Sequence, residues 1–443
     1  MNFLRWASVC LVFGVLAACG GGSTTTTCTI IGSPVLSYST PPLGYVGTAV
    51  SYTQRASNSV SSPCVISYAA SNLPAGLSIN PASGAISGAF TTEGTTTAVV
   101  TVTASGSDGT SRSTSTSLLF MAIRQLDWTV KTSSHGMGTL INQNLVSLGS
   151  TLYMLGSQQV GNNFMPLMYQ SIDGGAVWTN TGTPPPGFAS LRNFRVVADA
   201  GALYLIGGRT SNAAVTTPAS YTYNNAVLKY TAGSPGVWTT VAANPFTPTG
   251  GTEDLALVWD GSALYAYGGR IGVDVSKKLF RSINQGATWT LVSEALNYSV
   301  YGHCMMSDAT GVLYAVGGTG VSPGGFNIPS LTQFLKSPDG GITWVSYSQG
   351  LGSPTDPSSS IFSSCAAVDG RLYMLGGIDL TGLNYSNTVL QSTNKGVTWR
   401  VEPSSSVFGP RATHGMAVLN GKLVVLGGVN SLGARTDVLQ GTP

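Results

Sequence analysis

Residues 411–428 read RATHGMAVLNGKLVVLGG: two apolar runs joined by an Asn-Gly turn and ended by a Gly-Gly pair. Asn-Gly between alternating apolar residues is a strong signal for a two-residue β-hairpin. The second run, of the form Leu-Tyr-apolar-apolar-Gly-Gly, recurs six times with small changes. Its copies are residues 152–156, 203–208, 264–269, 313–318, 372–377 and 423–428. A spacing of roughly 50–60 residues is typical of propeller blades, so we predict a six-bladed β-propeller over residues 123–443.

The hairpin at residues 411–428 resembles the repeat of kelch propellers, the superfamily that includes galactose oxidase. Residues 171–178 (SIDGGAVW) and 337–344 (SPDGGITW) resemble the Asp-box of sialidase-like propellers, and residues 282–289 and 392–399 repeat it with Asn in place of Asp. An Asp or Asn at this place bonds its own backbone, and glycine accepts the positive φ of the turn. We therefore interpret these turns as architecture rather than catalytic sites.

The two ends of the predicted propeller complement each other. The last repeat ends at Pro443 without a Trp-bearing strand, whereas residues 127–132 (DWTVKT) stand alone before the first repeat. We expect this orphan strand to complete the last blade, because the pairing would cover two exposed sheet edges at once.

The N-terminus has the pattern of an export signal. A short apolar stretch ends in Leu-Ala-Ala-Cys at residues 16–19, and Gly, Ser and Thr follow to residue 27. This end resembles a lipobox, which implies a signal peptide over 1–18, acyl chains on Cys19 and a flexible tether over 19–32. Several acyl chains anchor a protein stably. We expect a lipid-anchored protein of the cell envelope, and Gly20 after the cysteine is compatible with the outer membrane.

Residues 33–122 form a separate module in the sequence. Residues 73–80 (LPAGLSIN) and 83–88 (SGAISG) resemble the immunoglobulin-like domains of bacterial surface proteins, and residues 98–103 (AVVTVT) read as a sandwich strand. Such modules act mostly as spacers, with ligand binding as the alternative. The predicted fold class is therefore all-β: an immunoglobulin-like β-sandwich followed by a six-bladed propeller that an N-terminal strand closes.

Two of the six cysteines lie in the signal peptide and the lipobox. In an oxidising compartment the other four pair naturally as Cys28–Cys64 and Cys304–Cys365. The second pair would join equivalent strand positions in adjacent blades. No Cys-x-x-Cys spacing suggests zinc, and the disulfide explains Cys304 and Cys365 better than a galactose-oxidase-like copper site, so we expect neither metal nor cofactor.

Composition bears on the partner. Charged residues make up only 8% of the chain and the net charge is +3, with no basic run, so nucleic acid is not an expected ligand. Short turns alternate with long, irregular connections along the repeats, which places all the long connections on one face, where function usually lies. The candidate binding residues near that face are Arg192, Arg209, Tyr221, Tyr223, Arg270, Tyr298, Tyr301, His303, Phe326, Phe362, Tyr385, Arg411 and His414.

Two kinds of titratable residue enter the predicted blades from the long-loop face. His135, His303 and His414 each precede or begin an innermost strand, where they are acid/base groups, metal ligands or structural side chains. Glu253 and Asp254 are the best acid candidates in a chain with few carboxylates.

Two functions remain open at this point. The first is a binding platform for carbohydrate or protein on the long-loop face. The second is a carbohydrate-active enzyme, sialate mutarotase-like or glycosidase-like, that uses Glu253, Asp254 or His414. No sialidase signature beyond the Asp-box-like turns is present, and a fold alone does not give a function.

Overall fold

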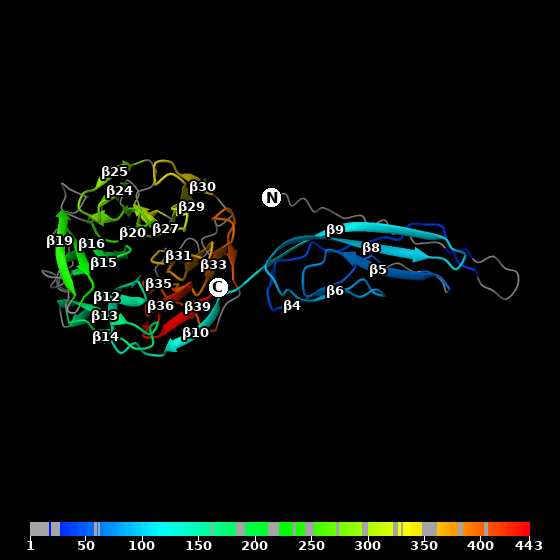
Figure 1. Cartoon of the computed structure of the whole chain (residues 1–443), viewed down its shortest axis with the longest axis horizontal. Coiled ribbons are helices and arrows are strands. Elements are labelled where there is room, and N and C mark those ends of the chain that lie inside the picture. The colour runs from blue at the N-terminus through cyan, green and yellow to red at the C-terminus, as the bar shows by residue number, and fades with distance from the viewer. Residues whose placement is uncertain are drawn as a thin grey trace. The chain divides into compact units, whose positions relative to one another are not determined.

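The computed structural model describes residues 17–18, 27–56, 60, 63–160, 163–182, 191–210, 221–233, 236–243, 252–271, 274–294, 300–321, 327–328, 331–347, 361–379, 384–402 and 406–443. Every regular element within these ranges is a β-strand, which confirms the all-β class (Figure 1). They form two compact units, Met1–Gln125 and Leu126–Pro443. No helix in the described ranges is long and apolar enough to cross a membrane.

The first unit is a two-sheet sandwich. One sheet has the order β3-β9-β8-β5 and the other β4-β7-β6. Their bounds are Gly44–Tyr45 (β3), Ala49–Tyr52 (β4), Val65–Ser71 (β5), Leu77–Ile79 (β6), Ile86–Ala89 (β7), Gly94–Ser105 (β8) and Ser111–Ile123 (β9). Val100 and Phe120 alternate inward from β8 and β9 onto Tyr52 and Ile86. The predicted Cys28–Cys64 disulfide is formed in this unit.

The second unit contains six sheets whose main path has four strands, numbered here 1 to 6 from the chain order of their innermost strands. Sheet 1 is β11 (Leu140–Leu148), β12 (Thr151–Val160), β13 (Asn163–Ser171) and β14 (Thr179–Asn180); sheet 2 is β15 (Leu191–Ala198), β16 (Leu203–Thr210), β18 (Ala226–Thr231) and β19 (Val237–Ala243); sheet 3 is β20 (Ala256–Trp259), β21 (Leu264–Tyr267), β24 (Leu279–Ser282) and β25 (Thr290–Ser293).

Sheets 4 to 6 repeat the pattern. Sheet 4 is β26 (Tyr301–Ser307), β27 (Leu313–Val321), β29 (Leu331–Ser337) and β30 (Val345–Tyr347); sheet 5 is β31 (Ser364–Val368), β32 (Arg371–Leu375), β33 (Val389–Ser392) and β34 (Arg400–Val401); sheet 6 is β35 (Gly415–Leu419), β36 (Lys422–Leu426), β39 (Val438–Thr442) and β10 (Asp127–Thr132). Short strands extend the loops: β17 (Thr222–Tyr223), β22 (Arg270–Ile271), β23 (Asp274–Val275), β28 (Asn327–Ile328), β37 (Val429–Asn430) and β38 (Gly433–Ala434).

The innermost strands close a ring. Each of β11, β15, β20, β26, β31 and β35 neighbours the next, and β35 neighbours β11 (Figure 1). The orphan strand predicted from the sequence is β10, which pairs antiparallel with β39, Trp128 facing Gly441. Trp128 also stacks on Phe408, with ring centroids 5.1 Å apart. The last sheet is therefore built from both ends of the unit, as expected.

The Ser-x-Asp turns hold the outer hairpin of their sheets. In sheet 1, Ser171 Oγ accepts the Gly175 N–H at 2.9 Å, Asp173 Oδ1 accepts the Ser171 hydroxyl at 2.7 Å, and Trp178 Nε1 donates to the Gly175 carbonyl at 3.1 Å. The turn after Ser337 repeats these bonds, and the turn after Ser282 repeats all three with Asn in place of Asp. The turn after Ser392, also with Asn, repeats the first two. The bonds satisfy the turn's own backbone and polar side chains, so the turns support the fold.

The Gly-Gly pairs adjoin the next sheet of the ring. Gly207 has φ +73°, and a Cβ there would overlap the Leu255 side chain and the Thr252 carbonyl oxygen. A Cβ at Gly268 would lie 2.8 Å from His303 Cε1, and one at Gly376 3.0 Å from His414 Cε1. In each case the side chain belongs to the next sheet of the ring and lies just before or near the start of that sheet's innermost strand. We call this contact the glycine step.

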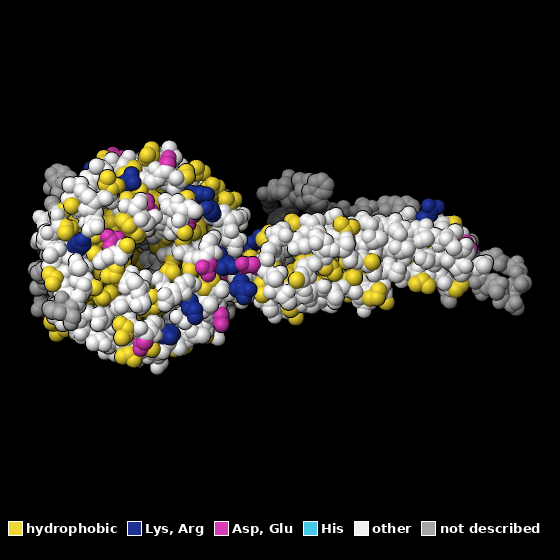
Figure 2. Space-filling model, in the orientation of Figure 1, with side chains coloured by type: hydrophobic (Ala, Val, Ile, Leu, Met, Phe, Trp, Pro, Cys, Tyr) yellow, Lys and Arg dark blue, Asp and Glu magenta, His cyan; other side chains and the backbone are white. Residues whose placement is uncertain are grey.

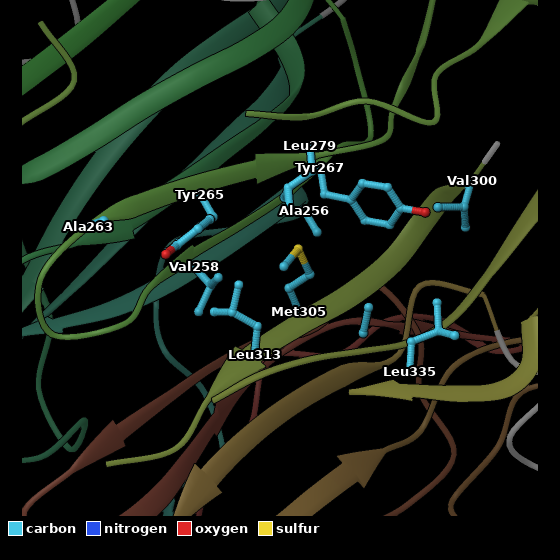
Figure 3. Close-up of a cluster of buried hydrophobic side chains, with 11 residues drawn as sticks. Ala256, Val258, Ala263, Tyr265, Tyr267, Leu279, Val300, Met305, Leu313 and Leu335 are labelled. Carbon is cyan, nitrogen blue, oxygen red and sulfur yellow. The ribbon is translucent and has the colours of Figure 1, made fainter. Parts of the chain in front are cut away.

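Apolar side chains fill the spaces between sheets. Figure 3 shows the cluster between sheets 3 and 4, where Tyr265 and Tyr267 of β21 lie with Met305 of β26 and Leu313 of β27. All four side chains are buried. Full burial of a Leu or Met side chain contributes about 2 kcal/mol, so such clusters add to the hydrogen bonds that cross between neighbouring sheets.

A buried carboxyl lies where the second unit begins. Glu402, after β34, is 5% exposed, and its Oε2 accepts the Leu126 N–H at 3.2 Å. Burial raises its pKa from 4.5 to about 7. The folded protein thus favours the protonated form, and the Glu402 contribution to stability falls as the pH rises from about 4.5 to about 7.

Glu402→Gln should remove this pH dependence, because the amide keeps a carbonyl for Leu126 without an ionisable group. The shift corresponds to about 3 kcal/mol, so the variant should exceed the wild type in stability by about that amount at pH 8 and match it near pH 4. Urea unfolding followed by tryptophan fluorescence measures this, since every tryptophan after Trp6 lies in the second unit. Equal pH slopes in both proteins would refute the assignment.

Candidate functional site

A cavity of about 410 Å³ lies along the axis of the ring. Residues from the innermost strands of all six sheets, or from the turns that enter them, line it. Figure 2 shows a hollow near the middle of this unit. The volume is in the range of small-molecule sites, about 300–1,000 Å³.

Six equivalent residues, one from each sheet, form a rim around this cavity. Each has a left-handed backbone, with φ between 54° and 64°. Along four consecutive links the N–H of one rim residue donates to the carbonyl of the rim residue in the preceding sheet, at 2.9–3.2 Å. The rim residues are Asn142, Asn193, Asp254, Gly302, Phe362 and Thr413. Asn, Asp and Gly tolerate this backbone best, so the rim explains their recurrence at the strand entrances.

Two of the candidate acids meet two of the candidate arginines at this rim. Glu253 Oε2 lies 3.0 Å from Arg209 Nε and accepts Asn193 Nδ2 at 2.7 Å, and its Oε1 lies 3.6 Å from Arg270 Nε. Asp254 Oδ2 lies 3.2 Å from Arg270 Nη2. Burial raises the pKa of Glu253, as does the charge of Asp254, and the two guanidinium groups oppose that rise.

Aromatic rings cover the arginines. The Arg209 guanidinium lies 3.7 Å from the Tyr221 ring centroid, and that of Arg270 lies 4.6 Å from the Tyr301 centroid. Arg192, opposite Arg209 in the β15–β16 register, lies 4.6 Å from the Phe164 centroid. Three cations thus face two carboxylates, which leaves positive charge at this place. We call the group the mouth cluster: Arg192, Arg209, Tyr221, Glu253, Asp254, Arg270 and Tyr301.

Two of the three histidines, His303 and His414, line the axial cavity, whereas His135 does not. His303 and His414 are 4% and 3% exposed and fill glycine steps, while His135 accepts the Met137 N–H through Nδ1 at 3.1 Å. Burial lowers the pKa of His303 and of His414 to about 3, helped by the charges of Arg195 and Arg411, so both rings are neutral at physiological pH. The described part of the chain holds no group of three His, Cys, Asp or Glu side chains placed to bind a metal.

Arg411 is fully buried, which leaves it no surface for a ligand. Its guanidinium makes two bonds to Asp437, at 2.8 and 3.2 Å, and a third to the Gly427 carbonyl at 3.0 Å. The expected binding role therefore gives way to a structural one. The sequence could not distinguish a binding role from a structural role, because Arg411 is buried through its pairing with Asp437, 26 residues further along the chain.

The remaining candidates scatter. Phe362 is a rim residue, Tyr223 pairs with Arg209 beside the mouth cluster, and Tyr385 bridges to Ile378 in sheet 5. Three further predictions, on Cys19, Tyr298 and Phe326, lie outside the described residues.

The Cys304–Cys365 disulfide is formed between β26 and β31, and both cysteines line the cavity. The two positions are not strictly equivalent. Cys304 faces Val316 in the register of sheet 4, whereas Cys365 faces Met374 in that of sheet 5, one residue nearer the hairpin turn. The pairing was predictable from the compartment, but the register was not.

Sequence reasoning missed the polar lining of the cavity. Asn142, Asn144, Asn193 and Arg195 all line it, from sheets 1 and 2. A signal for the two rim residues was present, since Asn142 and Asn193 stand at a fixed distance before their repeats' apolar hexamers. Arg195 carries no comparable local signal.

Comparisons with known proteins agree with the two-unit fold. Residues 33–120 match the family model described as "Putative Ig domain". No curated protein matches the sequence significantly. Among 254 matching chains of solved structures is that of YjhT, with 15% identity and a TM-score of 0.54 over 70% of this chain and 96% of that one. The family match thus identifies the immunoglobulin-like domain, and at 15% identity the structural likeness shows the propeller fold alone.

Replacing Glu253 tests whether the mouth cluster serves the fold. Glu253→Ala should destabilise the protein by about 3 kcal/mol, since it strips a buried partner from Arg209 and Asn193. Glu294→Ala is the matched control: this carboxylate is 45% exposed and lies 3.9 Å from Lys278, so its loss should change stability by less than about 0.5 kcal/mol. Urea unfolding measures both. If Glu253→Ala is as stable as the wild type, Glu253 does not contribute to stability and its role is functional.

Proposed function

We propose that this chain is a lipid-anchored envelope protein whose propeller binds a carbohydrate at the mouth cluster, with a protein surface as the alternative ligand. The observation that carries the proposal is the mouth cluster itself. It sets tyrosine rings, guanidinium groups with surplus positive charge and paired carboxylates at one side of an axial cavity.

The chemistry of the cluster suits a sugar. Flat aromatic faces beside fixed polar groups are what a sugar ring with many hydroxyls requires. Arg270 is 28% exposed and Arg209 is 12% exposed, so both keep some surface for a ligand. Their tight pairing with Glu253 holds the donors in fixed places, which lowers the entropy lost on binding.

An enzyme acting on carbohydrate is the second candidate, and one observation favours it. Glu253 and Asp254 are adjacent carboxyls, and the pKa of Glu253 is raised, as a general acid requires. Against this, Glu253 is 1% exposed and engaged by three side chains, and the third candidate, His414, is buried in a glycine step. A binding platform does not require an acid or base that can reach the substrate, so we prefer the binding function.

The proposed lipid anchor rests on the sequence around Cys19. In this proposal the immunoglobulin-like unit is a spacer, and the protein is anchored in the outer membrane. Two disulfides support an oxidising compartment. Labelled fatty acid should be incorporated into the wild-type chain, and Cys19→Ser should abolish it; incorporation that survives the substitution would rule out this anchor.

A glycan array probed with the mature chain tests the ligand. Arg192→Ala should weaken binding of any captured glycan at least tenfold, because the cluster loses a cation beside the ligand. Arg400→Ala, on the outermost strand β34, is the matched control and should bind as the wild type does.

Turnover is measured on the same glycans with Glu253→Gln and Asp254→Asn. Binding without turnover in the wild type supports the platform. Turnover that either variant abolishes while binding persists would overturn it in favour of the enzyme. If no glycan binds, carbohydrate is excluded and a protein ligand takes its place.

A further inference from the structure

Arg195 of β15 is an unpaired cation on the cavity wall. Its Nη1 donates to Asn142 Oδ1 at 3.2 Å and lies 3.5 Å from the Phe194 carbonyl, and both acceptors are neutral. Within the described ranges, no Asp or Glu forms an ion pair with it. Its Nε and Nη2 therefore keep N–H groups that no described residue accepts.

Arg195 lines the cavity, and its guanidinium also contacts Asn142 of the neighbouring sheet 1. The residue is half-buried. Its charge lowers the pKa of His303, which belongs to sheet 4, whereas Arg195 belongs to sheet 2.

The charges along the cavity do not balance at Arg195. Asp254 and Arg270 also line the cavity, but they pair with each other at 3.2 Å. His303 and His414 are neutral, so the described lining residues leave one positive charge. Burial lowers the pKa of Arg195, and the charge of Asp254 offsets that effect only in part. A desolvated cation that has no ion-pair partner of its own is unfavourable, and an anion in the cavity would stabilise it.

We propose that the axial cavity is an anion site in which the Arg195 guanidinium binds a small oxyanion, either inorganic or a carboxylate. The planar fork of an arginine suits two oxygens of one such group. The site needs none of Arg192, Arg209 or Tyr221, so it stands whether or not the mouth cluster binds a sugar.

Calorimetric titration of the full mature chain with sodium sulfate, phosphate and acetate, at constant ionic strength, tests the proposal. At least one anion should bind saturably, and Arg195→Gln should weaken that binding at least tenfold. Arg400→Gln removes the same charge from the outermost strand β34 and should bind as the wild type does. Saturation by sulfate or phosphate identifies an inorganic ligand, and saturation by acetate alone identifies a carboxylate.

A second readout needs no variant to fold. The chain has three histidines, all in the propeller, so ¹³C-labelled histidine gives three resolvable ring signals. The bound anion should shift the His303 signal saturably, because it neutralises the Arg195 charge that acts on that ring, and should leave His135 unmoved. The proposal is overturned if no anion binds the wild type saturably, if Arg195→Gln binds as tightly, or if binding leaves the His303 signal unchanged.

Discussion

The ring depends on the glycine step, in which a side chain of one sheet fills the space above a Gly-Gly pair of the sheet before it. Leu255 meets Gly207, His303 meets Gly268, His414 meets Gly376, and Gln143 meets Gly427. At Gly207 the φ of +73° disfavours any L side chain, and a Cβ would also overlap a backbone carbonyl. The pair must therefore be glycine for the next sheet to approach, which gives the repeat its signature.

The same contact places the functional rim. Each side chain in a glycine step directly follows a rim residue: His303 follows Gly302, and Leu255 follows Asp254. When a sheet packs against the glycines of the preceding sheet, its rim residue, which has a left-handed backbone, lies near the axis of the ring. There the rim residues hydrogen-bond to one another through their backbones. The cavity and the mouth cluster lie inside positions that packing has already fixed. This explains how a fold built from neutral side chains can hold buried charges such as Glu253.

The features that the sequence predicted were those that local chemistry determines. Turn residues, apolar alternation and the missing fourth strand of the last repeat led to the hairpins and to the closing strand with Trp128, and the compartment led to both disulfides. Features that join distant segments were not predictable. The contact between Arg209 and Glu253 crosses from sheet 2 to the entrance of sheet 3, and the buried Arg411–Asp437 pair looks in the sequence like two free charges. The place of Arg195 on the cavity wall depends on closure of the ring, which no local pattern in the sequence determines.

Gly207→Ala compared with Gly370→Ala tests the glycine step most directly. Both glycines have a φ near +70°, but a Cβ at Gly370, in a hairpin turn, has no atom within 4 Å. Gly370→Ala should therefore cost only the backbone strain, about 1 kcal/mol. Gly207→Ala should cost at least about 2 kcal/mol more, because the third sheet must shift. Urea unfolding followed by tryptophan fluorescence gives both values; equal losses of stability would contradict the account.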